Sequence, residues 1–280
     1  MNLHMYANPA TQQNIEILVQ RGHRFIEPAE GRMACGTVGK GRLAGLAEIQ
    51  RELTEVLLPQ RDLAGKRVLI TAGPTVEAID PVRFITNRSS GKMGYALARA
   101  ALRRGAQVTL VSGPTNLKPP ALADVVQVQT AREMHQAALQ AFPQADIVIA
   151  AAAVGDYRPL EAAPSKMKKT GDTITIVLQE NPDILKDLGS KKAGQILVGF
   201  AAESDDLLEN AKKKLESKHL DFIVANDVTK AGAGFDYDTN IITILSRQGQ
   251  QDFPLMSKDA AAEIILDQAA ARLPQADVEG

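Results

Sequence analysis

The chain has 280 residues, of which 45% are hydrophobic and 23% are charged, the usual composition of a soluble globular protein. This composition excludes a mainly disordered chain, a collagen-like chain and a disulfide scaffold. The 32 basic and 33 acidic residues give a net charge of -1, so no overall positive field could hold a nucleic acid or an anionic membrane. Aromatic residues make up only 4%, with no Trp, which argues against a stacking platform for single-stranded nucleic acid.

The sequence favours a cytoplasmic protein. Cys35 is the single cysteine, so no disulfide can form within the chain, which fits a reducing compartment. The first residues lack the basic and apolar regions of a signal peptide. The longest nearly apolar run, Ile147 to Gly155, is far shorter than the ~20 residues that a membrane span needs.

The first 50 residues differ in character from the rest of the chain. Asn8-Pro9-Ala10-Thr11 is typical of a helix start, and that helix should end at Gly22. A glycine-rich stretch over 31–45 has no helical or strand period, and a short helix is expected over 46–57. A segment of this size cannot bury a core of its own, so we interpret it as the tail of a larger domain or as an arm that packs on a partner.

From Lys66 onward, strand and helix patterns alternate. A strand at 67–71, a helix at 91–105 and a strand at 107–111 should form a βαβ unit, which is parallel and right-handed by default. Further strands are expected at 125–128, 146–150, 173–178, 196–200 and 221–225, a hairpin at 241–245 and 253–255, and helices at 131–142, 205–218 and 257–273. Another helix should begin with Asn181 as N-cap and Pro182 at its first position. This order predicts an α/β fold, a doubly wound, mostly parallel, Rossmann-like sheet with an antiparallel hairpin and an N-terminal arm.

The residues that follow the predicted strands are the candidates for ligand contact, because ligands bind beyond the carboxyl ends of an open parallel sheet. These residues are rich in Gly and Ala, and two strand ends carry the tripeptide Gly-Pro-Thr, at 73–75 and 113–115. Small residues let a ligand approach the backbone, and several such ends in one sheet indicate a nucleotide-sized ligand. Taken one at a time, each end is better explained as a tight turn between a strand and a helix.

The segment 87–94 precedes the first helix of this alternating region. Ser89 or Ser90 can cap that helix, and the free backbone N–H groups at its start favour an anion. The segment matches neither the P-loop pattern nor the dinucleotide fingerprint, and the second strand is followed by 112–114 (Ser-Gly-Pro) instead of an acid for the ribose. NAD binding is therefore weakly supported, and a capped structural helix is the plainer interpretation.

Two groups of lysines could neutralise a triphosphate. The short loop 164–171 contains Lys166 and is bounded by helix-breaking residues, and a mobile lysine loop beside a sheet crevice suits phosphate. Lys214 and Lys218 are four residues apart on an expected helix and share one face. Taken alone, the loop could be a solvated hairpin loop, and the helix face could be an ordinary solvent-exposed surface.

These motifs together resemble the phosphopantothenate–cysteine ligase domain of the bifunctional coenzyme A biosynthesis proteins. The resemblance covers about 66–273. It is carried by ITAGPTVEAIDPVRFITNRSSGKMGYALARAALRRGAQVTLVSGPT, AAAAVGDYRP, the Lys166-Met167-Lys168-Lys169 loop, Asn181-Pro182-Asp183-Ile184, Val198-Gly199-Phe200-Ala201-Ala202-Glu203 and Ala225-Asn226-Asp227-Val228. The expected domains are a remnant of the flavin-dependent decarboxylase at 1–50, a linker at 51–65, the ligase domain at 66–273 and a tail at 274–280.

The N-terminal arm resembles the substrate side of the decarboxylase half of the same family. Asn2 matches the asparagine that binds the substrate carboxylate, and Cys35 matches the cysteine that donates a proton. Thr37 stands where the family commonly has an acid, and no flavin-binding fold or catalytic histidine precedes Asn2. We therefore expect decarboxylase activity and FMN binding only in a full-length bifunctional protein. On this interpretation the chain is either shortened or has a gene start that lies further upstream. In this chain Cys35 is expected to be a small buried hydrophobic residue.

The resemblance implies a CTP-dependent ligase that joins 4′-phosphopantothenate to L-cysteine through an acyl-cytidylate, with Mg²⁺ or Mn²⁺ accompanying CTP. It implies Lys166 and Asn87 as catalytic residues, and Asn87, Ser89, Ser90 and Gly91 as substrate contacts. The nucleotide contacts that it implies are Ala150, Ala151, Ala152, Asp156, Lys166, Asn181, Pro182, Asp183, Ile184, Phe200, Lys214 and Lys218. The implied partners are the small-molecule substrates and a second copy of the chain. An NAD(P)-dependent reductase and a non-catalytic nucleotide-binding or assembly module remain as alternatives.

Overall fold

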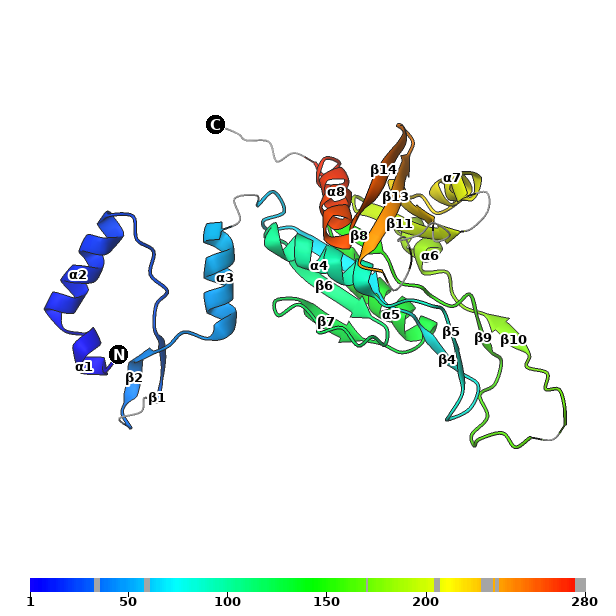
Figure 1. Ribbon diagram of the computed structural model, residues 1–280, viewed down its shortest axis with the longest axis horizontal. Helices are drawn as coiled ribbons and strands as arrows, with labels where there is room; N and C mark the ends of the chain where they lie inside the picture. The colour runs from blue at the N-terminus through cyan, green and yellow to red at the C-terminus, as the bar shows by residue number, and fades with distance from the viewer. Residues whose placement is uncertain are drawn as a thin grey trace. The chain divides into compact units, whose positions relative to one another are not determined.

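The computed structural model describes residues 1–32, 36–57, 61–169, 171–203, 207–227, 234 and 237–274. The chain forms two compact units, Met1–Pro59 and Gln60–Gly280, here called unit 1 and unit 2 (Figure 1). None of the described helices has the length and the apolar character that crossing a membrane requires.

Unit 1 consists of short elements with almost no interior. Its elements are α1 (Leu3–Tyr6), α2 (Pro9–Gln20), β1 (Ala29–Arg32), β2 (Val38–Arg42) and α3 (Leu46–Leu57), with β1 and β2 antiparallel. Among the residues of unit 1 whose burial is described, only Gly41 and Ala44 are buried. This confirms the prediction that the segment cannot bury a core of its own.

Unit 2 is built on one eight-stranded sheet. Its strands are β3 (Arg67–Ala72), β6 (Gln107–Ser112), β7 (Asp124–Gln127), β8 (Ile147–Ala150), β11 (Ile196–Glu203), β12 (Phe222–Asp227), β13 (Thr239–Ser246) and β14 (Gly249–Ser257). The spatial order is β14-β13-β12-β11-β8-β3-β6-β7, and the six strands from β12 to β7 are parallel. β13 runs antiparallel to β12, and β14 runs antiparallel to β13. The predicted fold class is therefore confirmed, and the strand order reverses between β3 and β8.

Helices cover both faces of this sheet (Figure 1). α4 (Lys92–Arg103) and α8 (Lys258–Ala270) pack against each other on one face. α5 (Ala131–Ala141), the 3₁₀ turn η1 (Phe142–Gln144), α6 (Ile184–Ser190) and α7 (Leu207–Ser217) lie on the other. Consecutive residues of β3 alternate between the two layers, because Val68 and Ile70 join the α4/α8 core whereas Leu69 joins the core beneath α5 and α6.

Two small antiparallel sheets extend unit 2 beyond the main sheet (Figure 1). One pairs β4 (Val76–Ala78) with β5 (Phe84–Thr86), and the other pairs β9 (Tyr157–Pro159) with β10 (Leu178–Glu180). Between β9 and β10 the chain makes a long detour over 160–177, here called the excursion. Its described residues belong to no strand.

The two Gly-Pro-Thr turns lie against each other at the ends of β3 and β6. A Cβ atom on Gly113 would lie 1.8 Å from the carbonyl oxygen of Pro74. Gly73 has φ +75°, and a Cβ there would meet the Thr115 methyl at 2.9 Å. Glycine at both turns is therefore required by close packing, which supports the interpretation that these ends are tight turns.

In unit 1, the glycine-rich stretch 31–45, which shows no strand period in sequence, nevertheless contains β2. In unit 2, three local predictions were wrong. The residues 173–177 alternate in sequence but are mostly exposed and have no neighbouring strand, so only Leu178–Glu180 pairs, with β9. The N-cap of α6 is Asp183, whose carboxylate accepts the N–H of Lys186 at 3.0 Å, and Asn181 bonds elsewhere. The N-cap of α4 is Gly91 at φ 76°, where a Cβ would meet Thr115 at 2.7 Å, so neither Ser89 nor Ser90 caps this helix.

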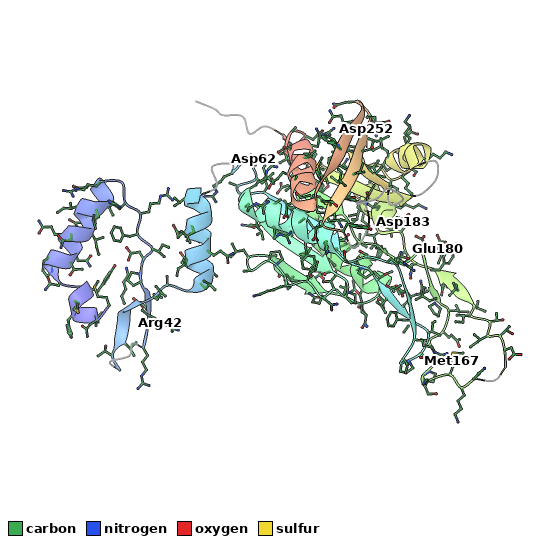
Figure 2. The ribbon with its side chains drawn as sticks, viewed as in Figure 1. Arg42, Asp62, Met167, Glu180, Asp183 and Asp252 are labelled. Atoms are coloured by element: carbon green, nitrogen blue, oxygen red, sulfur yellow. The ribbon has the colours of Figure 1, made fainter. Side chains whose placement is uncertain are left out.

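The two edges of the main sheet differ in length. β14 has nine residues, is mostly exposed and contains Pro254 in its interior. β7 has four residues and begins at Asp124. Asp252 on β14 accepts a hydrogen bond from the hydroxyl of Thr243 on β13 at 2.6 Å (Figure 2).

Candidate active site

A cleft of about 720 Å³ opens at the carboxyl ends of the parallel strands, at the point where the strand order reverses. This is where an open α/β sheet binds its ligands. The cleft is lined by 87–94, 150–157 and 180–185, together with Thr71, Phe200, Ala201, Lys214, Lys218, Asn226, Gly234, Asn240 and Lys258. It therefore runs across the sheet, from the α6/α7 layer to the α4/α8 layer.

Asn87 joins two walls of the cleft. Its side-chain amide donates to the carbonyl oxygen of Val154 at 2.9 Å and lies 3.5 Å from that of Ala153. Thr75 supports the same wall, because its hydroxyl accepts the N–H of Gly155 at 2.9 Å. The amide hydrogens of Asn87 are thus occupied by backbone carbonyls, so this side chain fixes the strand-end segment that follows β8.

The wall formed by 180–185 is held by a buried asparagine. Asn181 donates from its amide to the carbonyl oxygen of Gly155 at 2.8 Å and accepts from Arg158 at 2.9 Å. Arg158 also donates to the carbonyl oxygen of Glu180 at 2.6 Å. The nitrogen and the oxygen of the Asn181 amide are therefore both bonded within the protein. Asn181 contributes to a ligand site by positioning the backbone of the residues that follow it.

Asp183 and Lys218 form an ion pair at the α6/α7 end of the cleft (Figure 2). Lys218 Nζ lies 2.8 Å from Asp183 Oδ2, and a Cβ on Gly189 would lie 2.1 Å from the Lys218 carbonyl, so a glycine in α6 permits this approach. Burial by itself would raise the pKa of Asp183, but the hydrogen bonds from Lys218 and the Lys186 N–H outweigh it and lower the pKa overall. Asp183 therefore stays charged at neutral pH.

The α4/α8 end of the cleft is polar, and two of its residues, Asn240 and Lys258, were not predicted from the sequence. Lys258 is buried and donates to the carbonyl oxygens of Gly234 at 3.0 Å and Tyr237 at 2.5 Å. Lys92 pairs with Asp238 at 2.7 Å. Within the described part of the chain, the amide oxygens of Asn226 and Asn240 are buried without a hydrogen-bond partner. Only Asn226 lay in a segment that the sequence marked as a strand end. Asn240 and Lys258 come from the antiparallel β13 and from the start of α8, which no local motif marks.

The structure brings nearly all of the predicted ligase-site residues together. The cleft contains all the predicted nucleotide and substrate contacts except Lys166, and the roles of these residues stay predictions. Lys166 lies on the excursion and is exposed. Figure 2 shows its neighbour Met167 at the far end of the excursion, away from Asp183 and Glu180. Among the decarboxylase-type residues, Asn2 caps α1 by accepting the N–H of His4 at 2.9 Å, and Cys35 lies outside the described residues.

The described residues form no metal cage of their own, because no three or more of their His, Cys, Asp and Glu side chains are grouped closely enough to hold an ion. Asp156 and Glu180 are carboxylates that line the cleft. Magnesium usually binds through one or two carboxylates together with substrate phosphates. These residues therefore fit a magnesium ion only as a companion of the nucleotide.

Two family models match the chain, and together they span most of it. The model described as "DNA/pantothenate metabolism flavoprotein C-terminal domain" matches residues 63–273, and the model described as "Flavoprotein" matches residues 1–58. The first of these ranges includes every residue that lines the cleft.

Comparison with known proteins supports the same family. A protein of Bacillus subtilis (strain 168), "Coenzyme A biosynthesis bifunctional protein CoaBC", is 52% identical over 275 residues, which cover 96% of this chain and 68% of that protein. The protein of the same description from Vibrio cholerae serotype O1 is 48% identical over 269 residues, covering 95% and 67%. The crystal structure of the C-terminal domain of such a protein superposes with a TM-score of 0.66 at 46% identity, covering 75% of this chain and 97% of that one. The resemblance read from the sequence is confirmed, and the chain belongs to the DNA/pantothenate metabolism flavoprotein family.

Proposed function

We propose that the chain ligates 4′-phosphopantothenate to L-cysteine in coenzyme A biosynthesis, using CTP. The observation that carries this proposal is the cleft at the point where the strand order reverses. The family resemblance implies sixteen catalytic, nucleotide-binding and substrate-binding residues in the ligase domain, and fifteen of them line this cleft. The relatives described as bifunctional coenzyme A biosynthesis proteins support the pathway. The choice of CTP and the order of steps rest on the resemblance.

The proposed reaction has two steps. A carboxylate oxygen of phosphopantothenate attacks the α-phosphorus of CTP, and the bond to the β-phosphate breaks to release pyrophosphate. The amine nitrogen of cysteine then attacks the acyl carbon, CMP leaves, and the amide forms as the amine loses a proton. The first step brings two anions together, so cations and backbone N–H groups must offset their repulsion.

The residues of the cleft suit these tasks. The small side chains of Ala150, Ala151 and Ala152 let a nucleotide approach the backbone beyond β8. The backbone N–H groups at the start of α4 favour phosphate. Lys214 and Lys218 supply positive charge beside the α6 segment. Magnesium, bound with the triphosphate, would supply further charge neutralisation.

We propose that the active form is a homodimer. The excursion and the neighbouring small sheets carry exposed apolar side chains, with exposed fractions of 56% for Phe84, 55% for Leu160 and 63% for Val177. Lys166 does not line the cleft of its own chain. A second copy would cover these apolar side chains, and the excursion of one copy would present Lys166 to the cleft of the other.

The described residues of unit 1 do not fit a flavin. An isoalloxazine ring needs an enclosed, largely apolar site. Only two residues of unit 1 are buried among those whose burial is described, so this part of the chain forms no such enclosure. The decarboxylase reaction of the family therefore enters none of the steps above.

The direct test is detection of phosphopantothenoylcysteine and pyrophosphate from CTP, phosphopantothenate and cysteine. Lys166→Gln should reduce pyrophosphate release by ~10²–10³ without changing the thermal melt, because one preorganised cation is lost. A thermal-shift panel of CTP, ATP and NADPH separates the alternatives. A shift with NADPH alone would indicate a reductase, and a nucleotide shift without product would indicate a binding module.

The dimer has its own test. Lys166→Gln and Lys218→Gln should each be strongly impaired alone. When they are mixed and allowed to exchange subunits, they should regain a measurable fraction of activity, because one site of each mixed dimer is then intact. Sedimentation should show a dimer for both variants. Absence of recovery with proven exchange would mean that Lys166 serves its own cleft.

A further inference from the structure

The excursion that carries Lys166 is attached to the β4–β5 hairpin at Ala163 and again at Met167. The N–H of Ala163 donates to the carbonyl oxygen of Ile79 at 2.9 Å, and further along the excursion both backbone polar groups of Met167 are bonded. The N–H of Met167 donates to Asp80 Oδ2 at 3.1 Å, and its carbonyl oxygen accepts from Arg83 Nη2 at 3.1 Å. Met167 is the residue directly after Lys166.

Asp80 is the centre of this attachment. Its side chain has no exposed surface, and Oδ1 accepts the N–H groups of Val82 and Arg83, each at 2.8 Å. Oδ2 accepts from Arg83 Nε at 2.9 Å and Nη2 at 2.6 Å, in addition to the N–H of Met167. A carboxylate with five donors is bound strongly and in one orientation. The Asp80–Arg83 pair therefore joins the β4–β5 turn to the backbone of the excursion.

The charge of Asp80 persists through any ordinary assay pH. The hydrogen bonds from Arg83 are the main cause, and with the backbone N–H groups they hold the pKa of the Asp80 carboxyl well below its usual range in spite of burial. By contrast, the ammonium group of Lys166 forms no hydrogen bond or ion pair within the part of the chain that the structure describes. The attachment thus fixes the backbone beside Lys166 and leaves its side chain available.

We propose that Asp80 and Arg83 are positioning residues for the ligase reaction, which hold the backbone of Met167 and so set where Lys166 is presented to the nucleotide. This inference rests on the proposed function, in which Lys166 neutralises the triphosphate. A misplacement of about 1 Å in a catalytic group can cost as much as ~10²-fold in rate, so loss of the attachment should be visible in turnover.

The first experiment measures the attachment without reference to activity. Hydrogen–deuterium exchange of the full-length chain should show protection at the Met167 amide in the wild type, and Asp80→Asn should remove it. Asp172→Asn is the matched control, because Asp172 is an exposed carboxylate on the same excursion. Unchanged protection at Met167 in Asp80→Asn would overturn the proposal, whether or not the protein is a ligase.

The second experiment is a double-mutant cycle on pyrophosphate release. Asp80→Asn should lower kcat by about 10- to 100-fold with little change in the KM for CTP, and Asp172→Asn should match the wild type. In the Lys166→Gln background, Asp80→Asn should add no further loss, because its effect passes through Lys166. Losses that multiply in the double variant would overturn the proposal. An inactive wild type would instead reject the proposed function, and the exchange result would still stand.

Arg83→Lys covers the case in which Asp80→Asn does not fold. Lysine keeps the positive charge beside Asp80 but cannot donate from two nitrogens and reach the Met167 carbonyl at the same time. The expected result is a folded protein with intermediate exchange at Met167 and an intermediate kcat. A wild-type kcat with lost protection would show that the attachment has no part in the reaction.

Discussion

Two helices of equal length show how differently the two units are held. α2 in unit 1 has 12 residues, an asparagine N-cap with a good hydrogen bond and Pro at its start, yet none of its residues is buried. α4 in unit 2 also has 12 residues and lacks a side-chain cap, yet seven of its residues are buried. Local signals are thus enough to set where a helix begins, whereas burial decides whether the surrounding unit can hold it. The predictions below test this contrast, from the largest expected effect to the smallest.

The largest effect is expected from separating the units. Residues 60–280 should fold alone and melt cooperatively, because both core layers lie within them. Residues 1–59 should show no cooperative transition, because they lack a core. Circular dichroism and calorimetry of the two fragments would measure this. A sharp melt of the 1–59 fragment would contradict the contrast.

Leucine truncation should separate the units next. Leu97 in α4 has no exposed surface, and Leu97→Ala should lower the free energy of unfolding of unit 2 by about 2–5 kcal/mol. Leu18 in α2 is 36% exposed, and Leu18→Ala should change the free energy of unfolding of the full-length chain by less than about 0.5 kcal/mol. Urea denaturation of both variants gives the comparison. Equal losses would mean that α2 is supported by contacts of similar strength.

A third test adds one methyl group to a glycine in each unit. Gly113→Ala would place a Cβ 1.8 Å from the Pro74 carbonyl oxygen and should destabilise unit 2 by about 2–3 kcal/mol. Gly45→Ala meets no atom within 4 Å and has no positive φ, so it should be close to neutral. Thermal melts of both variants test this. A neutral Gly113→Ala would show that the paired turns can separate.

The smallest effect concerns one ion pair in each unit. The pKa of Asp183 is lowered, so its pair with Lys218 stabilises the fold at neutral pH, and this contribution fades as the pH falls below the ordinary carboxyl value of 3.8. Because the Asp183 side chain is 39% exposed, Asp183→Asn should cost no more than about 0.5 kcal/mol. Glu27, bonded to Lys40 and Tyr6, is 62% exposed, so Glu27→Gln should change nothing measurable. The urea midpoints of Asp183→Asn and Glu27→Gln, measured at pH 7 and pH 3, would distinguish the two ion pairs.

The sequence was most informative where a local pattern matches a buried environment. The continuous apolar run of β8 and the strand–helix–strand pattern around α4 predicted their elements, because both the strand and the helix are buried on the faces that the pattern implies. The prediction of a strand at 173–178 was wrong. Alternating hydrophobicity indicates which side chains share a face but does not supply a neighbouring strand to pair with, and no strand lies beside 173–177 in the described structure.

The same limit applies to the cleft. Small residues after parallel strands and the start of α4 could be placed at one edge of the sheet, because parallel strands bring their ends together. Lys258 and Asn240 could not, because they reach the cleft through the antiparallel β13 and the last helix. Asn87 was found, but its amide hydrogens bond the backbone of Ala153 and Val154, which only coordinates reveal.

The edges of the eight-stranded sheet bear on how this protein behaves at high concentration. An exposed edge strand offers unpaired N–H and C=O groups on which another chain can add a strand and begin an aggregate. β14 is long enough to serve as such a template, but Pro254 removes a donor from its interior and Asp252 places a charge nearby. β7 at the opposite edge ends after four residues. Both edges therefore discourage the sheet from growing into a fibril through its open sides.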